Sequence, residues 1–240
     1  YLGAAEWRQG TDMNKFEIQE KQYDFPYHHI PHWGKKGEPQ LSRILTWGWE
    51  YLTYMTQVVD LISEVGPMSL LDVGCGDGRL IGMVGESVPK KVGIDLSERA
   101  IALARGMVPD GEFRVKDVQS LKETFDCVTA VEVLEHIPDE AIASFAASLA
   151  ERARPGGFLI VSIPTRVAPL HRKHYRHYDR TLLLDHLAIE KNGLSVAREI
   201  YVYRETFLSR VIRSWVVNSV WTLTSRRLLR LLWEIHLRRY

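Results

Sequence analysis

Short apolar runs alternate with amphipathic stretches through the middle of the chain. The runs have the length and continuity of strands buried on both faces, and they cover residues 69–73, 91–95, 113–115, 126–131 and 158–163. Stretches with helical periodicity fill the gaps at residues 79–87, 97–107 and 139–152. This alternation predicts an α/β fold with a doubly wound, mostly parallel sheet.

The pattern changes after the fifth predicted strand. A helix is expected at residues 180–192, ending at Gly193, and a sixth strand at residues 195–203. Beyond it, apolar side chains recur at helical spacing: Phe207, Val211, Trp215, Val216, Val220 and Leu223. A seventh strand is therefore either hidden within residues 210–221 or replaced by helix.

The tryptophans divide the chain into three parts. All seven lie outside residues 66–204: Trp7, Trp33, Trp47, Trp49, Trp215, Trp221 and Trp233. We therefore expect an N-terminal aromatic cap or lid segment at residues 1–65, a compact core at 66–204 and a helical extension at 205–240. Within the cap, the histidine-rich stretch 23–34 is either a strap packed on the core or a lid that excludes water from a ligand.

The C-terminal extension is basic although the formal net charge of the whole chain is only +1. Residues 204–240 hold two acids and eight arginines: Arg204, Arg210, Arg213, Arg226, Arg227, Arg230, Arg238 and Arg239. Such an amphipathic extension can pack on its own protein as a lid or dimer helix, contact a membrane surface, or bind nucleic acid.

Composition and the lack of targeting patterns indicate where in the cell the protein is expected. The chain is 45% hydrophobic and 25% charged, which is typical of a globular protein. We find no signal-peptide pattern, no apolar run long enough to span a bilayer, and no disulfide or metal spacing in its two cysteines. We therefore expect a cytoplasmic protein, with membrane-surface association as an alternative.

A glycine-rich turn, Asp72-Val73-Gly74-Cys75-Gly76-Asp77-Gly78, follows the first predicted strand. Glycine at every second position lets the backbone turn tightly and approach a ligand closely. Asp95 ends the next strand, where nucleotide-binding βαβ units present a carboxylate to ribose hydroxyls. These features predict an adenosine site. Arg79 replaces the last glycine of the dinucleotide pattern, which disfavours a nucleotide-binding oxidoreductase.

This turn resembles the first motif of class I S-adenosylmethionine (SAM) methyltransferases, an acid-x-G-x-G-x-G strand exit. The resemblance covers residues 66–165 and implies a Rossmann-like methyltransferase fold with SAM as cofactor. It places at the cofactor Asp72, Gly74, Gly76, Asp95, Leu96, Asp117, Val118 and Val131. Asp117 matches the family's adenine-contacting position, although an acid at a strand end is often only a turn former or cap. Pro155-Gly156-Gly157 matches the family's turn before the fifth strand.

A second motif, Glu132-Val133-Leu134-Glu135-His136, follows the fourth predicted strand. On a helical turn, Glu132, Glu135 and His136 would converge on one side at the carboxyl end of the sheet, where open α/β sheets bind ligands. The stretch resembles ubiquinone-biosynthesis O-methyltransferases and terminal-ribose methyltransferases of small RNAs, whose two acids and histidine hold a divalent metal. The resemblance implies a further histidine ligand and nominates His174, with His177 and His171 as alternatives.

The chemistry gives a reason for a metal. SAM carries its methyl group on a sulfonium, so an enzyme must align the acceptor and make it nucleophilic. A divalent ion lowers the pKa of an acceptor hydroxyl, and carboxylate and imidazole ligands suit Mg²⁺, Mn²⁺ or Zn²⁺. Without a metal, His136 or His174 is the natural general base. A third interpretation leaves Glu132 holding the cofactor, with Glu135 and His136 as surface groups.

The sequence therefore predicts a SAM-dependent O-methyltransferase assisted by a divalent metal, Mg²⁺ or Mn²⁺. The expected acceptor is a hydroxyl of a small molecule, a sugar or a lipid-linked compound. One alternative is a terminal-ribose methyltransferase on RNA, which the absence of a basic patch in the core sequence disfavours. Others are the oxidoreductase and an inactive SAM-binding subunit. Peripheral membrane contact through the tail and a homodimer are further expectations.

Overall fold

The computed structural model describes residues 14–20, 32–33, 39–40, 42–167 and 170–202, and positions 207, 210, 211, 214, 225, 227, 228, 230, 231 and 234. Two helices precede the main sheet, α1 (Lys15–Glu20) and α2 (Ser42–Val65). Between them, β1 (His32–Trp33) and β2 (Pro39–Gln40) form an antiparallel pair. None of the helices in these residues is long and apolar enough to cross a membrane.

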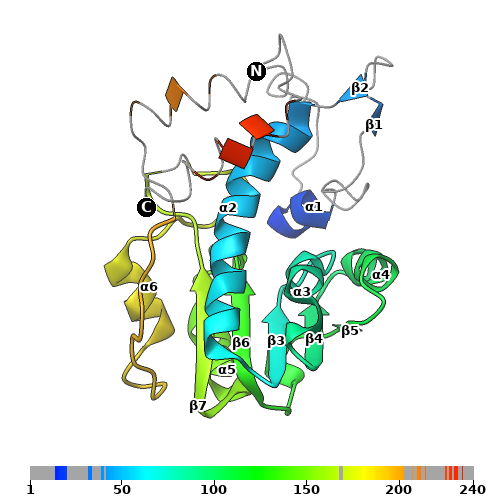
Figure 1. Cartoon of the computed structure of the whole chain (residues 1–240). Helices are drawn as coiled ribbons and strands as arrows, with labels where there is room; N and C mark the ends of the chain where they lie inside the picture. Colours follow the sequence, from blue (N-terminus) through cyan, green and yellow to red (C-terminus); the bar gives the residue numbers. More distant parts are fainter. Residues whose placement is uncertain are drawn as a thin grey trace.

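The main sheet has five strands: β3 (Ser69–Val73), β4 (Lys90–Asp95), β5 (Glu112–Val115), β6 (Phe125–Val131) and β7 (Ala153–Ser162). They are all parallel, in the spatial order β5-β4-β3-β6-β7. The chain enters at the central strand β3, builds outward to β5, then crosses back to β6. The predicted doubly wound parallel sheet is confirmed. Its switch point lies at the carboxyl ends of β3 and β6, where such sheets bind ligands (Figure 1).

Both faces of the sheet are covered, which explains the continuous apolar runs. Leu71 and Val128 belong to a core cluster shared with α5 (Ile142–Arg152). The neighbouring side chains Leu70 and Cys127 belong to a second cluster, shared with α2 and α3 (Arg79–Val84). Alternate residues of each strand therefore pack in opposite layers, with α2 in front of the sheet and α5 behind it (Figure 1).

Helix boundaries follow local capping. The helix α4 (Glu98–Met107) begins after Ser97, whose hydroxyl accepts a hydrogen bond from the Ala100 N–H at 3.0 Å. The helix predicted at 139–152 begins later, because Pro138 and Ala141 close a turn in front of it. The helix α6 (Arg180–Leu187) ends earlier than predicted, because Ala188 adopts a φ of +44°.

The sixth strand predicted at 195–203 is wrong for residues 195–202, which form neither strand nor helix. The side chains of Val196 and Tyr201 are 45% and 64% exposed, so the segment does not gain the burial that would favour pairing beside β7. Further along, positions 207, 210, 211 and 214 are helical, as the helical alternative expected. The rest of the possible seventh strand lies outside the described residues.

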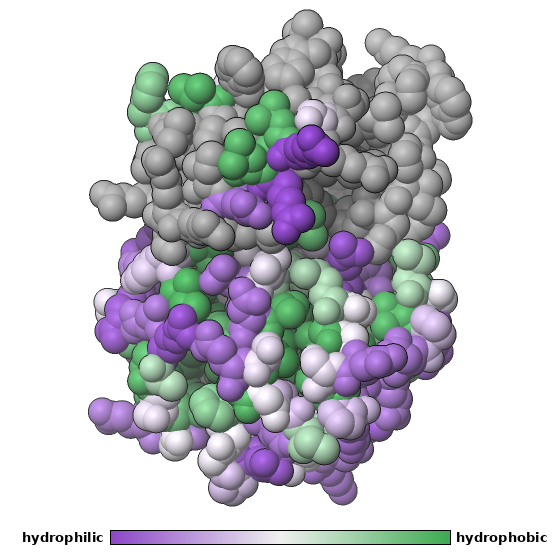
Figure 2. All heavy atoms as spheres, viewed as in Figure 1, coloured by the Kyte–Doolittle hydropathy of each residue, from purple (hydrophilic) through white to green (hydrophobic). Residues whose placement is uncertain are grey.

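The glycine-rich segment before residue 158 belongs to a strand. The sequence Pro155-Gly156-Gly157 lies inside β7 rather than in a turn before it, at an irregularity where the register with β6 shifts and Gly156 has a φ of +77°. The aromatic stretch 23–34 falls outside the described residues, apart from the two residues of β1. On the visible face of the described core, hydrophilic and hydrophobic side chains are interleaved (Figure 2), as is usual for a solvated surface.

Candidate functional site

The glycine turn requires its glycines. Gly74, Gly76 and Gly78 have φ values of +72°, +53° and +78°, which side-chain-bearing residues rarely adopt. A Cβ on Gly74 would lie 2.6 Å from Cγ2 of Val133. The Gly74 N–H also donates to the Ile94 carbonyl at 2.8 Å, which ties the end of β3 to β4. The turn is therefore held at the switch point with its backbone close to the β6 exit.

Asp95 joins the two strand ends. Its carboxylate accepts hydrogen bonds from the N–H groups of Gly76 and Ser97, each at 2.9 Å. Burial raises the pKa of Asp95, these hydrogen bonds lower it, and the nearby charge of Glu20 raises it again. The structure thus brings together Gly76 and Asp95, two residues nominated by the sequence.

An open depression of about 660 Å³ lies beside Asp95, and we call it the Leu96 depression. Its lining residues are Glu20, Leu96, Ser97, Glu98 and Arg99. The Leu96 side chain is 59% exposed although it follows a buried strand. An exposed apolar side chain in a polar hollow can cover one face of a flat aromatic ligand.

Asp72 lies inside the sheet. It is 3% exposed and its carboxylate accepts a hydrogen bond from the Thr129 hydroxyl at 2.7 Å. Burial raises the pKa of Asp72 to about 7, the Thr129 hydrogen bond opposes this shift, and the charge of Asp95 adds to it. Asp72 therefore links β3 to β6, and its contact with a cofactor remains a prediction.

The other cofactor candidates surround this edge of the sheet. Asp117 is exposed and accepts a hydrogen bond from the Gln119 N–H at 2.9 Å, so it caps the short helix η4 (Val118–Ser120). Val118 is 2% exposed, and Val131 ends β6. The capping role considered for Asp117 is thus present, and its adenine contact stays a prediction.

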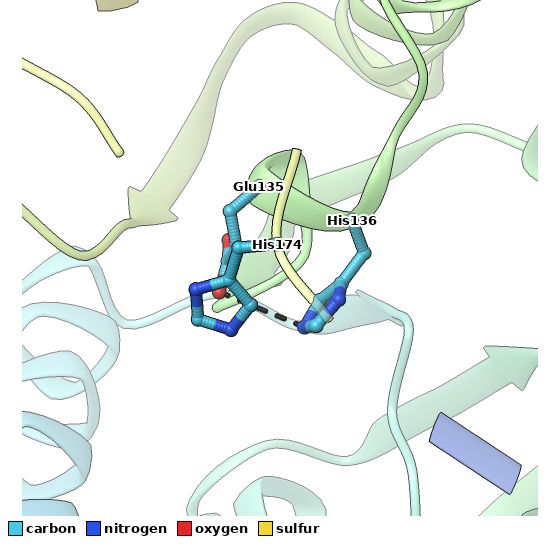
Figure 3. Close-up of side chains that lie close together, drawn as sticks. All are labelled: Glu135, His136 and His174. Carbon is cyan, nitrogen blue, oxygen red and sulfur yellow. Dashed lines mark ion pairs between the residues drawn. The ribbon is translucent and has the colours of Figure 1, made fainter. Parts of the chain in front are cut away.

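A buried to half-buried group of possible metal ligands lies beyond the end of β6. One ligand atom from each of Glu135, His136 and His174 lies within 4.8 Å of the others, and we call this set the carboxylate–imidazole group (Figure 3). Glu135 and His136 come from the short helix η5 (Leu134–His136), whereas His174 comes from the loop between β7 and α6. The structure thus brings together three of the four residues nominated for metal.

Glu135 has an unusual environment. It is 1% exposed, and neither of its carboxylate oxygens has a hydrogen-bond partner in the described part of the chain. Burial raises the pKa of Glu135 well above its usual range and the charge of Glu132 raises it further, while the nearby N–H of its own backbone and the charge of Lys173 lower it to a smaller extent. An unpartnered buried carboxylate is costly, so its environment suits a cation.

Both histidines of the group have their Nδ1 atoms engaged elsewhere. His136 Nδ1 is 3.3 Å from the Lys173 carbonyl oxygen, and His174 Nδ1 is 2.8 Å from His177 Nε2. The Nε2 atom of His136 lies 3.8 Å from Glu135. Burial lowers the pKa of His136 to about 4 and that of His174 to about 2, so both rings are neutral near pH 7. A neutral imidazole can bind a metal or accept a proton.

The position of Glu132 differs from the one that helical spacing predicted. It has a φ of +56°, so it does not share a helical turn with Glu135 and His136, and it lies outside the carboxylate–imidazole group. Its N–H donates to the Ser162 carbonyl at 2.9 Å, and its carboxylate accepts from the Ser162 hydroxyl at 2.8 Å. These bonds hold Glu132 against β7. A non-glycine residue with positive φ is strained, and such strain is common at functional sites.

The alternative histidines take other positions. His171 is exposed, and its Nδ1 lies 3.3 Å from the Lys173 N–H nitrogen. His177 contacts the ring of His174 rather than joining the group. Of the three histidines, His174, which the family resemblance nominated, is the one that lies in the group, and its role as a metal ligand stays a prediction.

Sequence reasoning missed α1. Its Lys15 ammonium donates to the His174 carbonyl at 2.5 Å and lies 4.3 Å from the centroid of the Tyr175 ring. At the other end of α1, Glu20 lines the Leu96 depression. The sequence does contain a signal for the start of this helix, because Asn14 and Glu17 have the spacing of a capping box. In the structure the backbone N–H of each donates to the side chain of the other, with N-to-O distances of 3.0 and 2.9 Å.

Sequence reasoning also missed the bonds that hold the His174 loop. The Tyr175 N–H donates to the Glu135 carbonyl at 2.7 Å. The Arg176 guanidinium and the Tyr178 hydroxyl both donate to the Leu134 carbonyl, at 3.1 and 3.3 Å. Tyr178 is fully buried. The loop is therefore clamped to η5, which places His174 beside Glu135.

The chain is similar in sequence to curated methyltransferases. The chain is 33% identical over 119 residues to a ubiquinone biosynthesis O-methyltransferase of Paracidovorax citrulli, covering 46% of this chain and 49% of that protein. The matched part thus spans about half the length of this curated relative.

Two solved structures share the fold over a longer stretch. Magnesium protoporphyrin IX methyltransferase (ChlM) from Synechocystis PCC 6803 with bound SAM has a TM-score of 0.60 at 19% identity, covering 82% of this chain and 94% of that one. The N-methyltransferase NodS from Bradyrhizobium japonicum in complex with S-adenosyl-L-homocysteine has a TM-score of 0.58 at 16% identity, covering 73% and 85%.

The model of a methyltransferase domain matches residues 49–213, which is more than half of the chain. This match includes the glycine turn, Asp95, the carboxylate–imidazole group and the whole parallel sheet. The chain therefore belongs to the class I SAM-dependent methyltransferase family.

Proposed function

We propose that this protein binds SAM at the Leu96 depression and transfers its methyl group to an acceptor hydroxyl, assisted by a divalent cation such as Mg²⁺ or Mn²⁺. The observation that carries this proposal is the buried carboxylate of Glu135, which lacks a hydrogen-bond partner among the described residues and lies beside two neutral histidines. It occurs at the carboxyl end of β6, next to the turn that would hold the cofactor.

The cofactor part of the proposal rests on the strand ends. Asp95 is fixed by two backbone N–H groups, and the next residue, the exposed Leu96, lines the depression. A carboxylate for a ribose and an apolar surface for an adenine ring therefore lie at neighbouring positions of the chain. Asp117 and Val118 follow the neighbouring strand β5 and complete the expected adenine side. Two solved structures of this fold carry SAM or S-adenosyl-L-homocysteine, which supports the same ligand here.

The metal part rests on how well the residues fit a cation. Glu135 would supply negative charge once a cation displaces its proton, and neither of its oxygens has a hydrogen-bond partner in the described residues. His174 offers a buried Nε2 atom that also lacks a partner there. His136 offers its Nε2 from the same side. When bound, a divalent ion would lower the pKa of an acceptor hydroxyl. Glu132, held by Ser162, adds a second negative charge nearby.

The acceptor part rests on the surface next to His174. In the loop that contains this histidine, Val167 is 81% exposed, Leu170 is 60% exposed, and Tyr175 is 40% exposed. Such apolar exposure beside a candidate site suits a hydrophobic or lipid-linked hydroxyl compound better than a sugar. The curated relative named as a ubiquinone biosynthesis O-methyltransferase supports oxygen as the acceptor atom. The basic tail would then add peripheral contact with an anionic membrane, and a homodimer remains a further proposal.

The test is methyl transfer from labelled SAM to a panel of hydroxylated acceptors, with and without a chelator. We expect transfer to a phenolic or lipid-linked hydroxyl, its loss in chelator, and its recovery with Mg²⁺ or Mn²⁺. SAM binding measured by calorimetry should persist in chelator. Full turnover of metal-free protein would reject the metal and leave His136 or His174 as general base. Absence of SAM binding would reject the proposal as a whole.

A further inference from the structure

His177 contacts His174 at Nδ1, whereas the other ring nitrogen of His174, Nε2, has no hydrogen-bond partner among the described residues. The two rings come from one turn of the loop, and His174 Nδ1 is 2.8 Å from His177 Nε2. Both side chains are nearly buried, at 9% and 8% exposure. The next residue, Tyr178, is fully buried, and its N–H donates to the Pro164 carbonyl at 3.0 Å. The chain is therefore anchored at the residue that follows His177.

A hydrogen bond between two imidazole nitrogens needs one N–H and one lone pair, so this contact couples the tautomers of the two rings. If the proton of His174 were on Nε2, a buried N–H would have no acceptor within the described residues. Buried N–H groups without an acceptor are rare and costly. If the proton is on Nδ1, it is donated to His177, and the His174 Nε2 lone pair remains available at the group.

His136 shows the same arrangement. Its Nδ1 is 3.3 Å from the Lys173 carbonyl oxygen, and a carbonyl can only accept. This contact places the His136 proton on Nδ1 and its lone pair on Nε2, the atom nearest Glu135. The two rings are thus supported from outside the group by two different acceptors.

We propose that His177 is a positioning residue that accepts a hydrogen bond from the His174 Nδ1–H and thereby holds the His174 Nε2 lone pair toward Glu135 and His136. The effect of His177 on metal binding rests on the proposed function, whereas its effect on the tautomer of His174 is independent of that function. Support of this kind typically changes metal affinity tenfold to a hundredfold, on the order of the effects seen for outer-shell partners elsewhere.

The experiment compares two substitutions of His177. In His177→Gln the side-chain amide oxygen can still accept from Nδ1–H, whereas in His177→Leu it cannot. His171→Asn is the matched control, because it removes a neighbouring ring of the same loop and keeps an acceptor for the Lys173 N–H. The readout is the nitrogen chemical shifts of ¹⁵N-labelled histidine in metal-free protein, with His174 assigned from the signals lost in His174→Asn.

We expect His174 to be the Nδ1–H tautomer in the wild type, in His177→Gln and in His171→Asn, and to lose this single tautomer in His177→Leu. An Nε2–H tautomer in the wild type would overturn the proposal, and so would an unchanged His174 signal in His177→Leu. Should His177→Leu fail to fold, the wild-type tautomer together with His177→Gln decides the outcome.

A second arm uses Mn²⁺ binding, followed by its paramagnetic resonance signal. His177→Leu should weaken Mn²⁺ binding on the order of tenfold or more, while His177→Gln and His171→Asn stay close to wild type. SAM affinity should be equal in all four proteins. Wild-type protein that binds no Mn²⁺ would reject the metal part of the proposed function, and the tautomer measurement would still decide the role of His177. Equal Mn²⁺ affinity in His177→Leu and wild type would overturn the positioning role.

Discussion

The carboxylate of Asp95 accepts a hydrogen bond from the Gly76 N–H at 2.9 Å, so the acid that ends β4 holds the glycine turn that ends β3. Its other oxygen accepts from the Ser97 N–H at the start of α4. Asp95 therefore has two tasks in the proposed site. It shapes the turn, and it would receive the ribose hydroxyls of SAM.

Replacement of Asp95 should weaken the cofactor far more than replacement of its neighbour. We expect Asp95→Ala to raise the SAM dissociation constant by tenfold to a hundredfold, on the order of 1.4–2.7 kcal/mol, because a polar pair is left unsatisfied. Glu98→Ala is the control, since it removes a nearby carboxylate that lines the Leu96 depression. Calorimetry measures both, and equal losses would show that general charge, rather than the Asp95 contacts, holds the ligand.

The two glutamates near β6 should differ in their effect on metal binding. Glu135→Gln should lower Mn²⁺ affinity tenfold or more, on the order expected for loss of a ligand charge, because its oxygens have no other described partner. Glu132→Gln should have a smaller effect, because that carboxylate is already bonded to Ser162. A larger loss in Glu132→Gln would restore the metal role that the sequence pattern gave to Glu132.

Gly74 offers a test of the turn that separates backbone strain from packing. Gly74→Ala should be destabilised by strain and by the 2.6 Å approach of its Cβ to Val133. Gly66→Ala is the control, because Gly66 also has a positive φ of +59° but no atom of the described residues lies within 4 Å of its Cβ position. We expect Gly74→Ala to lose about 1–3 kcal/mol more in urea unfolding than Gly66→Ala. Equal losses would show that Val133 moves aside freely.

Much of the sheet could be predicted from the sequence because buried parallel strands leave a plain signal. The run predicted at 69–73 is β3, and the runs at 91–95, 113–115 and 126–131 miss only the first residue of β4, β5 and β6. The sixth strand failed because apolar residues such as Val196 satisfy the local pattern without a partner strand to bury them. Strand pairing depends on tertiary contacts, which the local sequence pattern does not specify.

The sequence nominated many residues of the candidate site but predicted less of their arrangement in space. Asp95 and the glycines follow from the strand-turn pattern, and His174 came only through family resemblance. The positive φ of Glu132 could not be foreseen, because helical spacing assumes a regular turn that begins at that residue. The contribution of Lys15 was missed because it depends on how a six-residue helix docks, across a long sequence separation, against the His174 loop.

Asp72 should make stability depend on pH in a direction opposite to that of an ion-paired acid. Its folded pKa of about 7 exceeds the usual 3.8, so between these values the unfolded chain releases a proton that the native protein keeps. The free energy of unfolding should therefore fall as pH rises from 3.8 to about 7, and then level off. Urea unfolding across this range should show a shallower decline in Asp72→Asn.

Thr129→Val provides the second half of that test. The Thr129 hydroxyl donates to the Asp72 carboxylate and lowers its pKa, so its removal should raise the pKa further. The decline in stability should then extend to higher pH than in the wild type. A pH profile that is the same in wild type, Asp72→Asn and Thr129→Val would show that Asp72 ionises freely in the native protein.

The N-terminal segment should serve methyl transfer more than cofactor binding. Deletion of residues 1–40 removes α1, and with it the Lys15 contact to the His174 carbonyl and one lining residue of the Leu96 depression, Glu20. The glycine turn, Asp95 and Leu96, which carry the proposed SAM contacts, all remain. We expect SAM affinity to stay largely intact and transfer to the acceptor to be lost. Retention of the full rate would show that this segment is only packing on the core.

A point substitution isolates the part of this effect that the structure explains. Lys15→Met keeps the length of the side chain but removes the ammonium that binds the His174 carbonyl and lies over Tyr175. Because small displacements of a catalytic group cost large factors in rate, we expect transfer to fall on the order of tenfold with unchanged SAM affinity. Lys122→Met is the control for loss of one surface charge. If both variants keep the wild-type rate while the deletion abolishes it, the essential contacts lie elsewhere in residues 1–40 and α1 does not act through Lys15.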